Sequence, residues 1–158
     1  MRQLAGTVAV ASILFLLASV SVAANEIAAT ARSLAENVLG RGTVTSLTIA
    51  DQGATVLIRW ESATWRPNLK VDAVRDGLVA EAQLATGSIL GRLYTVSKIK
   101  FSIKRADAML ASGENNRSKG LSLTFAASLG GGTYVPAAAT GQPARSKPAG
   151  GSSSTAKD

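Results

Sequence analysis

The sequence predicts an α+β domain, an antiparallel sheet of about five strands with two helices packed on one face, in the order α-β-β-α-β-β-β. Two observations predict it. Apolar residues alternate with polar ones in five short segments, as in strands buried on one side, and recur every three or four residues in two others, as in amphipathic helices. The strands also come in runs, which favours helices gathered on one face of an antiparallel sheet.

The first helix is predicted after residue 24, in "NEIAATARSLAENVLGRG". Its apolar positions are spaced by four, three and four residues and so share one face: Ile27, Ala31, Leu34 and Val38. Asn25 can cap its start, and Gly40 can adopt the left-handed conformation that ends a helix. Because the helix is short and rich in alanine, it needs a surface on which to dock.

A hairpin is predicted next, in "TVTSLTIADQGATVLIRWESATWRP". Leu47 and Ile49 alternate with hydroxyl residues, and the turn "DQG" supplies a glycine that tolerates positive φ. After the turn, alternate apolar positions share a face, and Pro67 ends the strand because it has no N–H to donate. These positions are Val56, Ile58 and Trp60.

The period then becomes helical from Asn68, with polar residues, Glu81 among them, on the side expected to face solvent. We expect Gly77 to permit close packing and the helix to end between Gly87 and Gly91, because each glycine inside a helix costs about 1 kcal/mol relative to alanine. The apolar positions are Val71, Val74, Leu78, Ala82, Ala85, Ile89 and Leu93.

Three further strands are predicted in "VSKIKFSIKR", "AMLASGENNR" and "GLSLTFAASL". The first of them has two different faces. Ile99, Phe101 and Ile103 alternate with lysines, so the apolar side is expected to lie under the helices. Lys98, Lys100 and Lys104 are then expected to point from the uncovered face.

The two ends of the chain differ from the domain between them. Residues 1–24 have a positive start, an uncharged apolar run and small residues at Val22 and Ala24, the order of a cleavable signal peptide. An uncleaved membrane anchor is the alternative, since about 20 apolar residues just span a bilayer. Residues 25–135 are predicted to form one domain, and residues 136–158, rich in Pro, Ala, Gly and Ser, a disordered tail. Without cysteine, an exported domain must rely on its hydrophobic core.

Composition narrows the chemistry. The chain has no His and no Cys, which excludes Ser-His-Asp and Cys-His catalysis and imidazole or thiolate metal sites. We therefore expect no enzyme, cofactor or metal; a small hydrolase using Glu61 is a weak alternative, because no partner carboxylate is identifiable. The net charge of +7 favours anionic partners, whereas export and an aromatic content of 4% argue against nucleic acid.

Two groups of residues are candidate contacts for a partner. One is the lysine row at Lys98, Lys100 and Lys104, whose simpler interpretation is a solvated sheet face. The other is the pair Trp65 and Arg66, although the Trp65 ring is equally well explained as closing the end of the core.

The predicted function is an exported binding domain for an anionic envelope lipid or glycan, or for a protein partner, with peripheral membrane contact possible through its basic sheet face. The alternative is a structural or assembly subunit whose last strand, Gly120 to Ala126, pairs with a neighbouring chain.

A partial similarity to the BON family of small exported domains covers residues 43–105. It rests on "ADQGATVLI", the helix that follows and the strand at Ser97. Gly53 follows the turn, but Arg59 and Trp60 stand where a second glycine would be looked for, and the three-strand ending is extra. The similarity does not assign the chain to the family; membership would imply binding to envelope phospholipid.

Overall fold

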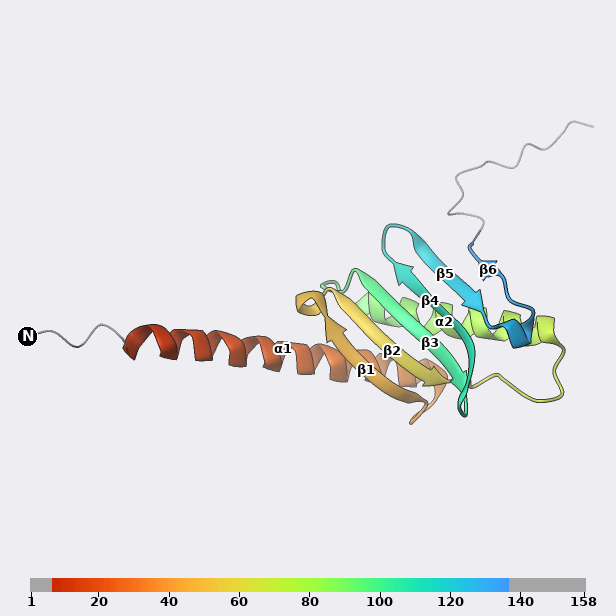
Figure 1. Cartoon of the computed structure of the whole chain (residues 1–158), viewed down its shortest axis with the longest axis horizontal. Coiled ribbons are helices and arrows are strands. Elements are labelled where there is room, and N and C mark those ends of the chain that lie inside the picture. The colour runs from red at the N-terminus through yellow and green to blue at the C-terminus, as the bar shows by residue number, and fades with distance from the viewer. Residues whose placement is uncertain (1–6, 137–158) are drawn as a thin grey trace, which may run out of the picture.

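The structure, a computed structural model, describes residues 7–136 and shows one sheet with two long helices running behind it (Figure 1). The helices and strands are α1 (Thr7–Leu39), β1 (Val44–Ala50), β2 (Thr55–Glu61), α2 (Val71–Arg92), β3 (Lys98–Arg105), β4 (Ala108–Asn116), β5 (Gly120–Phe125) and β6 (Thr133–Tyr134). Two single turns of 3₁₀ helix, η1 (Asp51–Gly53) and η2 (Ala127–Leu129), lie between strands. The predicted tail, residues 136–158, falls outside the described residues except for Pro136.

The strands lie in sequence order, β1 to β6, and every neighbouring pair is antiparallel except β2 and β3. The predicted α+β class is therefore confirmed. The parallel pair arises because α2 connects the end of β2 to the start of β3, which is the crossover that parallel strands require. The short strand β6, which follows the last of the predicted strands and pairs with β5, was not predicted.

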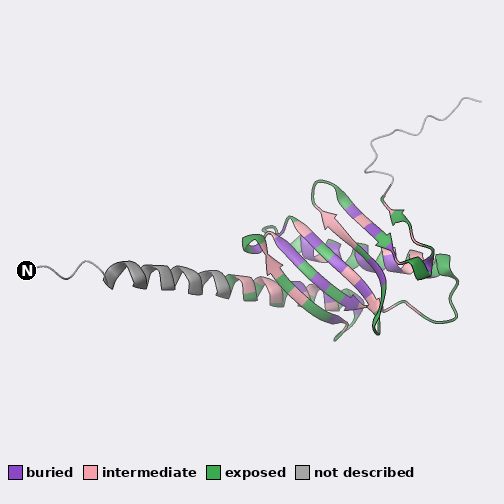
Figure 2. Ribbon diagram, viewed as in Figure 1, coloured by how far each residue is buried: buried purple, intermediate pink, exposed green. Residues whose placement is uncertain are grey.

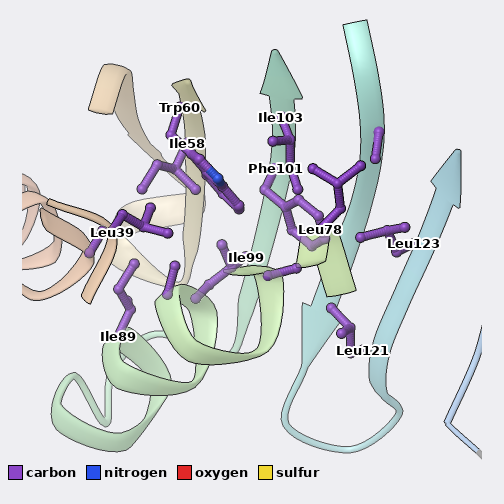
Figure 3. Packing of buried hydrophobic residues seen from close by; sticks show 14 of the residues in the cluster. Leu39, Ile58, Trp60, Leu78, Ile89, Ile99, Phe101, Ile103, Leu121 and Leu123 are labelled. Atoms are coloured by element: carbon purple, nitrogen blue, oxygen red, sulfur yellow. The ribbon is translucent and has the colours of Figure 1, made fainter. Parts of the chain in front are cut away.

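The core fills the space between the sheet and the helices (Figure 3). Leu78 and Ile89 project from α2 toward apolar side chains of the central strands. Trp60 of β2 and Phe101 of β3 stack there with ring centroids 5.4 Å apart. Figure 2 shows buried and exposed residues alternating along the strands, as expected for a sheet covered on one face only.

Helix α1 differs from the prediction at its start. It runs without a break from Thr7 through Asn25, so Asn25 lies inside the helix and does not cap it. Gly40 ends it as predicted, with φ +106°. Its C-terminal part packs on the domain, where Ile27 contacts the core, whereas Val22 is 66% exposed. Within the part of the chain that the structure describes, no helix has both the length and the apolar character needed to cross a membrane.

Helix α2 continues beyond its predicted end and stops at Arg92, so both Gly87 and Gly91 are helical. Arg117 explains part of this extension. Its guanidinium donates to the carbonyl oxygens of Leu90 and Leu93, the second at 3.0 Å, and so satisfies groups that the helix end leaves free. Gly77 does pack closely, as predicted, but against Thr64 of the preceding loop.

Candidate functional site

The uncovered side of the sheet, here called the open face, carries the predicted lysine row. Ile99, Phe101 and Ile103 are buried under the helices, as predicted, and the residues between them project from the other side. Lys100 is exposed, while Lys98 and Lys104 are half-buried. The open face otherwise consists largely of hydroxyl side chains: Ser46, Thr48, Ser102, Ser112, Ser122, Thr124 and Thr133.

Arg59 is the open-face residue that the sequence analysis did not select. It lies on β2 between Ser46 of β1 and Ser102 of β3, and its Nε donates to Ser102 Oγ at 3.2 Å. Arg59 and Lys100 both line a hollow of about 340 Å³. The other residues lining it include no acid: Ser46, Thr48, Leu57, Ile58, Phe101 and Ser102. Two cations beside three hydroxyls form a surface suited to phosphate or carboxylate oxygens.

Two carboxylates stand near the lysine row, although β3 itself has none. Strand register places Glu114 of β4 beside Lys100, and Glu61 of β2 beside Lys104. Neither forms an ion pair; among the described residues the single ion pair joins Arg32 and Glu36, at 3.5 Å. The open face is thus less positive than β3 alone implies. Within the hollow, Arg59 and Lys100 stand with no acid in the lining.

Trp65 and Arg66 lie apart from the hollow, in the loop between β2 and α2. This loop adjoins the end of β3, because Ser62 N donates to Lys104 O at 2.8 Å. The Trp65 ring is half-buried against the core, and the Arg105 guanidinium lies 5.4 Å from its centroid. Arg66 Nη1 donates to the carbonyl oxygens of Ala63 and Trp65 at 3.0 and 2.8 Å. The structure therefore gives both residues contacts within the loop and at the core edge.

Glu61, the candidate for a hydrolase, accepts a hydrogen bond from Ala106 N at 2.9 Å. Its partner in register is Lys104, and no second carboxylate accompanies it across these strands. Among the described residues, no group of three or more acids is placed to hold a metal ion. The arrangement around Glu61 favours a structural contact between β2 and the β3–β4 turn.

The prediction that Glu81 faces solvent was wrong. Glu81 is 3% exposed, and its carboxylate accepts four hydrogen bonds. Oε2 accepts from Trp60 Nε1 at 3.0 Å; Oε1 accepts from Ser62 Oγ at 2.9 Å, Thr64 N at 2.7 Å and Thr64 Oγ1 at 2.6 Å. With every donor supplied by the protein, Glu81 fastens α2 to the loop after β2.

The sheet has two different edges. β6 pairs with β5 at Leu123 and Thr124, so part of the strand predicted to pair with a neighbour is already occupied. β1 forms the other edge and pairs only with β2. Its sequence, "VTSLTIA", has no charged residue and no proline, although a bulge interrupts it between Val44 and Ser46.

Comparison with known proteins yields no assignment: no family model, no curated protein and no solved structure matches this chain. The partial similarity to the BON family thus gains no support, and the site must be interpreted from its own residues.

Proposed function

We propose that this protein is an exported, non-enzymatic domain that binds an anionic component of the cell envelope through the open face of its sheet. The observation that carries the proposal is the hollow in which Arg59 and Lys100 stand beside three hydroxyls with no acid in its lining. Such a surface favours oxygen anions, present in phospholipid head groups and acidic glycans, which charge-assisted hydrogen bonds recognise. A protein partner with an acidic surface is the alternative ligand for the same face.

Export supports this assignment. Residues 1–24 have the charge and hydropathy order of a signal peptide, and in an exported protein the abundant polyanions are envelope lipids and glycans. Cleavage after Ala24 is proposed, with an uncleaved anchor as the alternative. In either form the open face belongs to the part of the chain after Gly40, so both leave it intact.

The test replaces Lys98, Lys100 and Lys104 together by Ser. We expect the free energy of unfolding to change by no more than about 0.5 kcal/mol per site, because these are surface substitutions. We also expect weaker binding to an acidic polysaccharide and to vesicles containing phosphatidylglycerol, measured by co-sedimentation, since three charges on one face are lost. Arg59→Ser should weaken binding to the polysaccharide in the same direction.

Phe101→Ser is the control on the buried side of the same strand. Phe101 is 4% exposed and stacks on Trp60, so this change should unfold the domain. A triple variant that unfolds would show that the lysines are structural. A triple variant that stays folded and binds as before would show that the lysines of the open face are only solvated and do not bind the ligand.

A second candidate function, assembly by strand pairing, is favoured by the β1 edge, which has no charged side chain of its own. The start of this edge is occupied, because Arg32 Nη1 of α1 donates to Val44 O at 2.6 Å. Ionic strength separates the two functions. Binding of a polyanion should weaken as salt rises, whereas main-chain pairing between strands should persist. Light scattering of the protein at low and high salt measures whether chains associate by strand pairing.

A further inference from the structure

We infer that a second surface, separate from the hollow on the open face, rests on an anionic phospholipid bilayer. It consists of Arg92, Tyr94, Arg117 and Lys119 and is called the Tyr94 corner below. Arg92 ends α2, Tyr94 follows it, and the other two residues lie in the turn between β4 and β5. The inference does not depend on the proposed function, because none of these residues lines the hollow.

Arg117 holds the corner together. Its Nε donates to Val96 O at 2.8 Å, and its Nη2 donates to Leu93 O at 3.0 Å, so the β4–β5 turn is fastened to the end of α2. The Arg117 guanidinium also lies 5.7 Å from the centroid of the Tyr94 ring. Three cations and one aromatic ring from two distant segments therefore share one end of the molecule.

The chemistry of the corner fits a lipid surface. Tyr94 is 83% exposed, the most exposed of the large apolar side chains described, and tyrosine has the apolar body and polar tip that favour the head-group region. The cations beside it would attract anionic lipids. No acid is among the residues of the corner, and none of its three cations forms an ion pair in the described part of the chain.

In the uncleaved form of the protein, the path of α1 favours a bilayer over a soluble polyanion as the ligand of the corner. Ile27 of α1 packs on Gly53, Ala54 O accepts from Ser97 N at 2.9 Å, and Ser97 O accepts from Arg117 N at 3.1 Å. These contacts place the corner at the end of the sheet from which α1 leaves the domain, as Figure 1 shows. The sequence of α1 continues there into the apolar run of the export signal. In the form that keeps residues 1–24, the alternative to cleavage after Ala24, that run would bring this end of the sheet close to the head groups.

The first experiment measures partitioning of the exported protein onto phosphatidylcholine vesicles with and without phosphatidylglycerol. Arg92→Gln with Lys119→Gln should lower the partition coefficient on anionic vesicles roughly 25-fold, from about 1 kcal/mol per cation near the surface. Arg117 is left unchanged because it holds α2. Vesicle binding equal to that of the unaltered protein would overturn the inference, as would no binding of the unaltered protein to anionic vesicles.

The second experiment locates the contact. The chain has no cysteine, so a single introduced one carries a polarity-sensitive dye at a unique position. Dye on Tyr94→Cys should brighten when anionic vesicles are added, whether or not dye on Thr48→Cys, in the hollow of the open face, brightens as well. Brightening of the dye at residue 48 alone would overturn the inference that the Tyr94 corner contacts lipid, and would show that the open face contacts it instead. Polysaccharide binding unaffected by the triple lysine change would instead refute the proposed function while leaving the corner standing.

Discussion

Glu81 is a buried acidic residue whose carboxylate has no cation as a hydrogen-bond partner. Glu81 is stable there because the donors around it are neutral groups already fixed by the fold: an indole N–H, two hydroxyls and a backbone N–H. Buried polar atoms that keep all their partners cost little, whereas leaving donors unpaired is expensive. Glu81 also holds the Trp60 ring in the position where it stacks on Phe101.

Replacing Glu81 by Ala should destabilise the protein by about 3 kcal/mol or more, because it strands several buried donors. Glu81→Gln should cost less, about 1 to 3 kcal/mol, since the amide oxygen can keep the bonds to Ser62 and Thr64 while its NH₂ group faces Trp60 N–H. Urea unfolding followed by tryptophan fluorescence measures both. Equal stability of the two variants would show that the hydrogen bonds of Oε1 contribute nothing.

The lysine row was predictable because strict alternation fixes which side chains share a face. Glu81 was not. Glu81 lies three residues after Leu78 and next to Ala82, at the border of the apolar stripe of α2. At that border, helical periodicity does not decide whether a side chain faces the core or the solvent. The residues that decide its environment come from the loop at Ser62 to Thr64, and no spacing rule connects that loop to the helix. Alternation also puts Arg59 on the face opposite Ile58 and Trp60, but the hollow depends on strand register across three strands.

At the scale of elements, the glycines of α2 differ in what surrounds them. Nothing lies within 4 Å of the position that a Cβ would take at Gly87, whereas at Gly77 that position is 2.7 Å from Thr64 Oγ1. Gly77 is needed for close approach of the loop, and Gly87 is simply tolerated within a helix anchored at both ends.

Gly87→Ala should therefore stabilise the protein by about 0.5 to 1 kcal/mol, because alanine loses less backbone entropy on helix formation. Gly77→Ala is the matched change and should destabilise it by about 1 to 3 kcal/mol through crowding of Thr64, whose hydroxyl is bound to Glu81. Thermal unfolding followed by circular dichroism compares them. Stabilisation by both changes would contradict the packing at Gly77.

Periodicity located the helices and the five longer strands, but not all of their boundaries. The end of α2 was misplaced because the glycine penalty is local, whereas the Arg117 contacts that extend the helix come from the β4–β5 turn. β6 has two residues, Thr133 and Tyr134, too few for any period to register. The parallel pairing of β2 with β3 depends on the path of α2 across the sheet, which alternation within a strand does not specify.

At the scale of the whole molecule, α1 divides into a part that packs and a part that extends away. A chain beginning at Asn25 should unfold with a free energy within about 0.5 kcal/mol of the full chain, because Ile27 is the first residue, among those whose side chains the structure describes, that packs on the core. A chain beginning at Glu36 is the control and should lose cooperative unfolding, since it removes Ala31 and Ala35 from the core. Loss of folding in the longer of these two chains would contradict this division.

Intact mass of the protein recovered after export tests the cleavage itself. We expect a mature form that starts at Asn25, since Val22 and Ala24 meet the small-residue requirement. A mass that includes Met1 through Ala24 would establish the anchored form.

The length of β3 limits the size of ligand that the lysine row can select. Six residues separate Lys98 from Lys104, which at about 3.3 Å per residue places their backbones about 20 Å apart. A single phosphate or sugar carboxylate spans only a fraction of that distance, so it could not contact Lys98 and Lys104 together. Only a polymer of repeating anionic units, or several head groups side by side, would engage the whole row, and its avidity would then grow with chain length.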